Sequence, residues 1–148
     1  MFKNKKIHFI GIGGISMSGI AEIVKSLGGI VSGSDIKESE LTKRLTQDGM
    51  NIKYGHHPEM IKDADIVVYT AAIHEDDPER IEVKKLHKEN YERAKFLGII
   101  SKQYENCLCI SGTHGKSTTT GMVSMCFLEA NLNPTIQIGA MLSSINGN

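Results

Sequence analysis

Residues 6–16 read KIHFIGIGGIS, and this stretch decides the fold. Its first five residues, with isoleucine or phenylalanine at positions 7, 9 and 10, are typical of a short buried β-strand. A turn with glycines at positions 11, 13 and 14 follows, and residues 15–27 repeat apolar side chains at three-to-four spacing, as one face of a helix does. A strand, a glycine-rich turn and a helix in this order predict the first unit of an α/β fold.

The glycine-rich turn is a candidate anion-binding site. Main-chain N–H groups at the start of a helix, together with the helix dipole, favour a diphosphate there. We therefore predict that the diphosphate of a nucleotide contacts Gly11, Gly13, Gly14, Ile15 and Ser16. Ser16 stands where the usual dinucleotide-binding pattern has its third glycine. The pattern does not specify which nucleotide binds.

An acidic residue ends the next predicted strand, Ile30–Asp35. Asp35 follows the turn by about twenty residues, where dinucleotide-binding folds place the carboxylate that binds a ribose hydroxyl. We predict this contact for Asp35. The alternative interpretation is that Asp35 caps a helix or stabilises a turn.

Strand-like and helix-like segments alternate along the rest of the chain. Strands are predicted at 51–54, 66–69, 107–110 and 135–138, and helices at 41–47, 58–61, 78–88 and 92–104. This alternation predicts a Rossmann-like parallel sheet with flanking helices at residues 1–105, followed by the start of a P-loop α/β domain at 106–148. Because such sheets bind ligands at the carboxyl ends of their strands, His56, Thr70 and Ala71 join the predicted nucleotide site.

A second phosphate-binding motif lies at residues 111–120, which read SGTHGKSTTT. It follows the apolar run 107–110 and opens a helix-like segment, as a P-loop does. The general P-loop pattern has a further glycine where this chain has Ile110, so this loop is shorter. We predict that the phosphates of ATP are bound by Gly112, Thr113, His114, Gly115, Lys116, Ser117 and Thr118.

Three side chains of this loop carry the expected chemistry. Lys116 is predicted to neutralise the β- and γ-phosphates, and the Ser117 hydroxyl is predicted to contact Mg²⁺. His114 either touches phosphate or substrate, or only tolerates the tight turn. The alternative for the whole motif is a plain strand-to-helix turn with an exposed lysine. That alternative explains the glycines but not the Lys-Ser pair at the start of the helix.

Composition restricts the class of protein. Of the 148 residues 40% are hydrophobic, and 17 basic residues balance 17 acidic ones, so the formal net charge is zero. We expect neither nucleic acid nor a membrane as a partner, because nothing provides electrostatic attraction and no apolar run is as long as a membrane span. The three cysteines lack the spacing of a disulfide framework, which is typical of reduced thiols in the cytoplasm.

Four segments together resemble the Mur ligase family. They are residues 11–22 (GIGGISMSGIAE), 32–35 (SGSD), 68–73 (VYTAAI) and 112–120 (GTHGKSTTT). The resemblance covers nearly the whole chain, and the shortened phosphate loop is the form that this family uses. Ser16 departs from the family's usual glycine. Ser117 replaces a more common threonine, which offers Mg²⁺ an equivalent hydroxyl.

The resemblance implies an ATP-dependent ligase of peptidoglycan precursor synthesis. ATP would phosphorylate the carboxylate of UDP-N-acetylmuramic acid, and the amine of L-alanine would attack the acyl phosphate to give an amide, ADP and phosphate. Lys116 and His114 would be catalytic, with ATP and Mg²⁺ as cofactors. Mur ligases have three domains, so the resemblance also implies that the central domain is incomplete here and the C-terminal domain is missing. We expect such a truncated chain to bind the UDP substrate without catalysing ligation.

Three other functions stay open. The first is a related ligase that attaches a recycled peptide to the same nucleotide sugar. The second is a module that binds NAD(H) without catalysis, which tight NADH binding with no response to UDP would favour. The third is an interaction protein whose glycine loops are only turns, which the absence of any nucleotide-induced thermal shift would favour.

Overall fold

Five parallel strands form the centre of residues 1–142, the part of the chain that this computed structural model describes. They are β1 (Lys6–Ile10), β2 (Ile30–Asp35), β3 (Asn51–Tyr54), β4 (Ile66–Tyr69) and β5 (Glu89–Glu92). Their order in the sheet is β3-β2-β1-β4-β5, and every neighbouring pair is parallel. From β1 the chain adds β2 and β3 on one side and then crosses back to add β4 and β5 on the other side. This order confirms the predicted Rossmann-like fold class.

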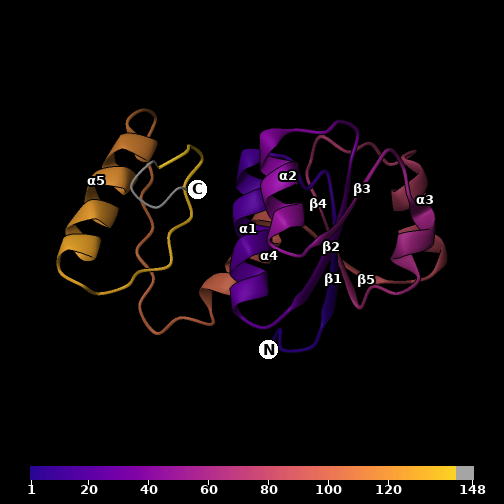
Figure 1. Cartoon of the computed structure of the whole chain (residues 1–148), viewed down its shortest axis with the longest axis horizontal. Coiled ribbons are helices and arrows are strands. Elements are labelled where there is room, and N and C mark those ends of the chain that lie inside the picture. Colours follow the sequence, from indigo (N-terminus) through magenta and orange to yellow (C-terminus); the bar gives the residue numbers. More distant parts are fainter. Residues whose placement is uncertain (143–148) are drawn as a thin grey trace.

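Helices cover both faces of this sheet. α1 (Ile15–Ser26), α2 (Glu40–Gln47) and α4 (Arg93–Ser101) lie on one face, whereas α3 (Pro78–Lys85) lies on the other (Figure 1). The short 3₁₀ helix η1 (Pro58–Ile61) packs beside α3.

The alternation of side chains along each strand explains the two layers. On β4, Val68 belongs to the larger core beneath α1 and α4, while Val67 belongs to the smaller core beneath α3. Phe9 and Phe96 are fully buried in the larger core and contact each other edge to face, with ring centroids 6.1 Å apart. Burial of these apolar side chains packs β1 and α1 tightly together, which fixes the position of the glycine-rich turn between them.

The segment between α3 and α4 differs from the sequence prediction. β5 was not predicted, because its sequence ENYE has no apolar alternation. Its backbone nevertheless pairs with β4 in the register Ile66 to Glu89 and Tyr69 to Glu92, as a polar edge strand can. As a result α3 ends at Lys85 and α4 begins at Arg93.

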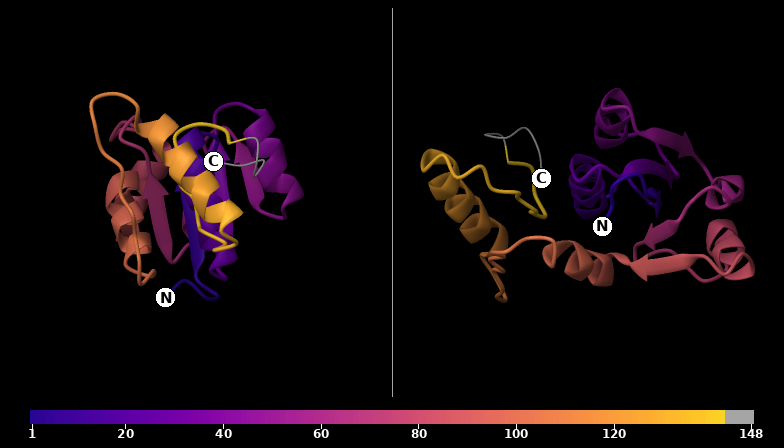
Figure 2. Two further views of the ribbon diagram at one scale, coloured as in Figure 1. Left: turned by 90° about the vertical axis from the view of Figure 1, so that its left-hand side faces the viewer. Right: turned by 90° about the horizontal axis from the view of Figure 1, so that it is seen from below.

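The chain continues from α4 to α5 (Lys116–Glu129), which stands apart from the sheet on the side of α1 and α4 (Figures 1 and 2). A cleft of about 910 Å³ separates α5 from α4. The strand predictions for 107–110 and 135–138 are wrong, because within residues 1–142 neither segment has a neighbouring strand to accept its backbone hydrogen bonds. Nor does any helix there have the length and apolar character to cross a membrane.

Candidate functional site

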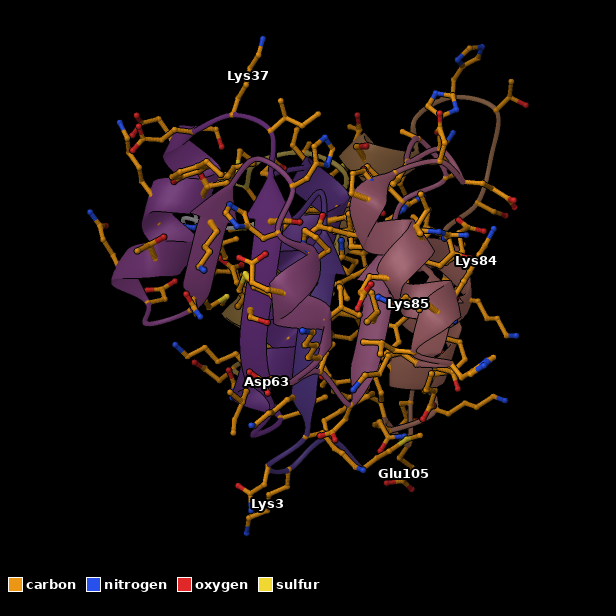
Figure 3. The ribbon with its side chains drawn as sticks, turned by 90° about the vertical axis from the view of Figure 1, so that its right-hand side faces the viewer. Lys3, Lys37, Asp63, Lys84, Lys85 and Glu105 are labelled. Atoms are coloured by element: carbon orange, nitrogen blue, oxygen red, sulfur yellow. The ribbon has the colours of Figure 1, made fainter. Side chains whose placement is uncertain are left out.

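The predicted nucleotide-binding residues lie at the carboxyl edge of the sheet. The turn 11–14 joins β1 to α1, Asp35 ends β2, His56 follows β3 by two residues, and Thr70 follows β4 directly. Figure 3 shows Lys37, just beyond β2, projecting from this edge, whereas Lys3 and Glu105 mark the opposite end of the molecule. The topology therefore places residues from four strand ends on one side of the molecule.

Most amides of the glycine-rich turn already have acceptors within the protein. The N–H groups of Gly11 and Ile12 donate to the Ser34 carbonyl at 2.9 and 3.0 Å, and the Gly14 N–H donates to the Gly11 carbonyl at 3.4 Å. The Gly13 N–H donates to the Asp35 carboxylate at 2.8 Å. Of the residues predicted to bind the anion, those in the first turn of α1 therefore remain the better candidates, because the N–H groups of residues 11–14 are already bonded.

The first turn of α1 is open to an anion. Gly14 is the N-cap residue, no side chain caps the helix, and its first turn holds no acidic residue. Gly14 and Ile15 are exposed, and the Ser16 N–H has no acceptor among the described residues. The helix dipole adds partial positive charge at this end.

Gly13 and Asp35 form the contact that fixes the turn. A Cβ atom on Gly13 would lie 2.8 Å from the Asp35 Oδ2 and 2.9 Å from the Thr42 methyl group, so glycine is required at this position. Asp35 also accepts from the Lys37 N–H at 3.3 Å. An ionised carboxylate can accept about four hydrogen bonds, so these two leave Asp35 with capacity for a sugar hydroxyl.

The turn after β4 lies against the glycine-rich turn. The Thr70 methyl group lies 3.2 Å from the Cβ position of Gly11, where φ is +78° and a side chain would be strained. The Thr70 Oγ1 accepts from the Ala72 N–H at 3.1 Å, and Ala71 is exposed beside it. Thr70 and Ala71 therefore border the same edge as the predicted diphosphate contact.

His56 lies on the side of this edge that α3 occupies. Its Nδ1 is 3.1 Å from the Asp77 Oδ2, and its side chain is 48% exposed. Asp77 is the N-cap of α3, since its Oδ1 accepts from the N–H groups of Glu79 and Arg80 at 2.8 and 3.3 Å. The α3 helix thus holds His56 in place while leaving it accessible to a ligand.

A buried polar network beneath His56 was missed by sequence reasoning. Glu79 is 1% exposed, and its Oε2 accepts from the Ser34 hydroxyl at 2.7 Å. Its Oε1 accepts from the His57 N–H at 3.2 Å and lies 3.5 Å from the Nε2 of fully buried His8. His8 in turn contacts the Ser32 hydroxyl at 2.9 Å through Nδ1. A usable signal was present, because His8, Ser32 and Ser34 occupy strand positions of the kind that otherwise carry apolar residues.

Hydrogen bonds decide the charge of Glu79. Burial opposes its ionisation, but the nearby His8 ring and the hydrogen bonds from the Ser34 hydroxyl and the His57 N–H outweigh burial, and the pKa of Glu79 is lowered. Ligand atoms of Glu79, Asp77 and His56 lie within 4.8 Å of one another. Each carboxylate oxygen of this trio already has a protein partner, so the arrangement is explained without a cation.

His57 turns away from His56 toward other partners. Its Nε2 donates to the Tyr54 carbonyl at 2.9 Å, and its Nδ1 lies 2.8 Å from the Glu59 carboxylate. These contacts raise the pKa of His57, with the Tyr54 carbonyl contributing most. The His57 hydrogen bond lowers the pKa of Glu59 to about 2. His57 therefore shapes the turn after β3, whereas His56 faces Asp77.

The second predicted site has the geometry of a phosphate loop. Gly115, with φ at +76°, is the N-cap of α5, and the first turn of this helix holds no acidic residue. The N–H groups of Lys116, Ser117 and Thr118 have no acceptor among residues 1–142. Residues 111–119, which include Gly112, Thr113 and His114, are exposed.

Lys116 folds over this loop. Its Nζ donates to the Gly112 carbonyl at 2.7 Å and to the Thr113 carbonyl at 3.2 Å. The loop therefore combines a cation with free N–H groups at a helix N-terminus, the two features that bind a polyphosphate. The Ser117 hydroxyl, in the first turn of α5, is an oxygen of the kind that a hard cation such as Mg²⁺ prefers.

One side chain at the first site has no counterpart in the sequence motifs. Arg93, the first residue of α4, donates from its Nη1 to the Ser16 hydroxyl at 2.6 Å. The two residues are 77 positions apart, so no local pattern could have joined them.

Comparison with known proteins identifies relatives of this arrangement. A family model described as Mur ligase family, catalytic domain, matches residues 6–105. UDP-N-acetylmuramate–L-alanine ligases of Acetivibrio thermocellus and Clostridium botulinum (strain Kyoto) are 53% and 55% identical over 146 residues, 99% of this chain. The crystal structure of a UDP-N-acetylmuramate–alanine ligase from Thermotoga maritima matches 97% of this chain with a TM-score of 0.90 and 34% identity.

The match covers a limited part of these relatives. The chain spans 31% and 32% of the two ligase sequences and 34% of the Thermotoga maritima chain. Within that span, the family model covers the whole sheet and the candidate nucleotide site. On this evidence the chain belongs to the Mur ligase family.

Proposed function

We propose that this chain is the nucleotide-binding part of an ATP-dependent ligase that joins L-alanine to UDP-N-acetylmuramic acid in the cytoplasm. The observation that carries the proposal is the presence of two open helix N-termini in one chain, one after β1 and one at the short Lys-Ser loop. Relatives at 53% and 55% identity with this ligase name support the same choice. A dehydrogenase would use the first site alone, and a simple nucleotide hydrolase the second alone.

The first site would hold the UDP part of the substrate. Its diphosphate would lie at the start of α1, a ribose hydroxyl would bind Asp35, and His56 would contact the nucleoside end. Thr70 and Ala71 would border the sugar. This arrangement extends the substrate along the carboxyl edge of the sheet, which is where ligands of such folds bind.

The second site would activate the substrate. A carboxylate is a poor acyl donor because its oxygen is a poor leaving group, and phosphorylation by ATP turns it into a good one. Lys116 and the free amides of the loop would align and neutralise the transferred phosphoryl group. His114 stands in the same exposed loop, where it could contact phosphate or substrate. The Ser117 hydroxyl would hold Mg²⁺, which supplies further charge neutralisation when it is bound.

The ligation itself is proposed for a longer protein. Because this chain spans about a third of the length of its relatives, we propose that their remaining segments, the rest of the central domain and the C-terminal domain, supply the L-alanine site. The chain by itself would bind nucleotides.

A related activity is a second candidate. Crystal structures of murein peptide ligases from Psychrobacter arcticus and Neisseria meningitidis match this chain with TM-scores of 0.80 and 0.81 at 28% and 29% identity. Both values are lower than those for the Thermotoga maritima alanine ligase, so attachment of alanine is the better supported of the two.

Calorimetric titration of the 148-residue chain tests the proposal. We expect heat of binding with UDP-N-acetylmuramic acid and with Mg-ATP, no binding of NADH, and no alanine-dependent release of ADP. Binding of NADH with no response to UDP-N-acetylmuramic acid would refute the first site as proposed. ADP release that requires L-alanine would show that the chain needs no further segment for catalysis.

A further inference from the structure

The hydrogen bond between Ser16 and Arg93 places a cation at the mouth of the first phosphate site. Ser16 lies in the first turn of α1, and Arg93 reaches it from the start of α4. The contact between the Arg93 Nη1 and the Ser16 Oγ is 2.6 Å long. A guanidinium has five N–H donors in a planar fork, so this bond leaves most of them available.

Arg93 has no carboxylate partner in the described part of the chain. Each ion pair found within residues 1–142 involves other cations, and α1 carries no acidic residue in its first turn. Arg93 is half-buried, so its guanidinium has lost part of its hydration shell. No protein anion among the described residues replaces the lost water. An arginine in this position is suited to an anionic ligand.

The glycine-rich turn makes such a cation necessary. Four of its N–H groups, those of residues 11–14, already donate to protein acceptors, including the negatively charged Asp35 carboxylate. The Ser16 N–H and the helix dipole offer only a partial positive charge to a diphosphate that carries at least two negative charges. A fixed guanidinium beside them would supply the missing donors and charge.

We propose that Arg93 binds the diphosphate of the nucleotide substrate, and that Ser16, which stands in place of a glycine, positions the guanidinium for this contact. The inference rests on the proposed function of the first site. Gln137 supports the position of Ser16 from the other side, since its Nε2 donates to the Ser16 carbonyl at 3.4 Å. The serine side chain and main chain are thus both held before a ligand arrives.

Nucleotide binding to charge variants tests the proposal. The affinity of the 148-residue chain for UDP is measured by calorimetry at several salt concentrations, and its affinity for uridine by ligand-observed NMR. Arg93→Gln is expected to weaken UDP binding about ten- to a hundredfold, the loss that removal of a charge-assisted hydrogen bond produces. Uridine, which has no phosphate, is expected to bind unchanged, and the salt dependence of UDP binding should become shallower.

Three further variants separate a binding role from a structural one. Lys95→Gln is the matched control, because Lys95 lies on the same helix and its Nζ sits 5.5 Å from the Tyr91 ring rather than at α1. Arg93→Lys should restore part of the UDP affinity, since it keeps the charge but loses the fork. Ser16→Ala should weaken UDP binding by a smaller factor, and adding it to Arg93→Gln should have little further effect.

The outcomes distinguish this inference from the proposed function. If the unchanged chain binds UDP and Arg93→Gln behaves like Lys95→Gln, the role of Arg93 is wrong while the UDP site stands. If Arg93→Gln weakens uridine as much as UDP, Arg93 is structural and the inference is also wrong. If the unchanged chain binds no UDP, the proposed function of the first site fails and this inference fails with it. A thermal melt of each variant checks its fold, and Arg93→Lys and Ser16→Ala give the answer should Arg93→Gln not fold.

Discussion

Replacing Glu79 by alanine should be among the most destabilising single changes on the α3 side of the sheet. Glu79 joins three elements, because its carboxylate contacts Ser34 on β2, His57 after β3 and His8 on β1. Alanine would leave the buried Ser34 hydroxyl and the partly buried His57 N–H without an acceptor, and would remove the carboxylate that lies 3.5 Å from the His8 Nε2. The turn that presents His56 would lose its support at the same time.

The structure sets the expected magnitude. Glu79 and His8 are 1% and 0% exposed, so water cannot replace the lost partner. Leaving the Ser34 hydroxyl and the His57 N–H without their acceptor costs about 1–3 kcal/mol for each group, so Glu79→Ala should lower the free energy of unfolding by about 2–5 kcal/mol. Glu79→Gln should cost less, about 1–2 kcal/mol, because the amide oxygen can still accept from the His57 N–H while the amide nitrogen donates to the Ser34 hydroxyl oxygen, which reverses that hydrogen bond.

The pH dependence of this effect follows from the direction of the shift. The pKa of Glu79 is lowered in the folded chain, so its contribution to stability is complete above the ordinary carboxyl pKa of about 4.3 and declines as the pH falls through the lowered value. The stability difference between the unchanged chain and Glu79→Gln should therefore shrink below about pH 4.

Urea denaturation followed by tyrosine fluorescence is the appropriate assay. The four tyrosines, at positions 54, 69, 91 and 104, all precede residue 106, so the signal reports on the sheet rather than on α5. Glu75→Gln is the control, because Glu75 is 81% exposed and pairs with Lys84 on the surface, where such pairs contribute little. If Glu79→Ala unfolded at the same urea concentration as Glu75→Gln, the argument for a buried, mutually dependent network would be refuted.

Three further changes test other parts of the fold. Gly13→Ala should reduce UDP affinity and destabilise the chain by about 1–3 kcal/mol, because the new methyl group would meet the Asp35 carboxylate at 2.8 Å; calorimetry and urea denaturation measure the two effects. Ser39→Ala should cost about 1 kcal/mol in urea denaturation, since Ser39 forms a capping box at the start of α2. In His57→Gln, an NMR titration should find the pKa of Glu59 moved from about 2 toward the ordinary carboxyl range; an unchanged midpoint would show that His57 does not cause the shift.

Local sequence patterns predicted most of the sheet. β1, β2, β3 and β4 lie at the predicted residues, because each is a short apolar or alternating run between turn residues. β5 could not be found in this way, since its residues are held by backbone pairing at an edge and not by apolar burial. The opposite error occurred at 107–110 and 135–138, where apolar runs predicted strands but the described residues provide no pairing partner.

Long-range contacts limit what sequence reasoning finds at the site. The turn 11–14 and the loop 112–118 are local motifs, and both lie at the start of a helix as predicted. Arg93 and Glu79 reach their partners across 77 and 45 residues, so their roles depend on the tertiary fold. The role of Asp35 falls between these cases, because spacing suggested a sugar contact and the structure adds a hydrogen bond to Gly13.

The two proposed phosphate sites differ in how much must change when a ligand binds. At the first, Asp35, Ser34 and Ser16 already hold the surrounding groups in place, so little rearrangement should accompany binding. At the second, the Lys116 Nζ donates to two loop carbonyls, so only one of its three N–H donors is left for a phosphate unless these contacts break. Breaking these contacts reduces the net free energy of ATP binding, whereas preorganisation preserves that of UDP binding. The nucleotide sugar should therefore bind this chain more tightly than ATP does. The first proposed site also contacts the segment that carries the second, because Gln137, which follows α5, donates to the Ser16 carbonyl.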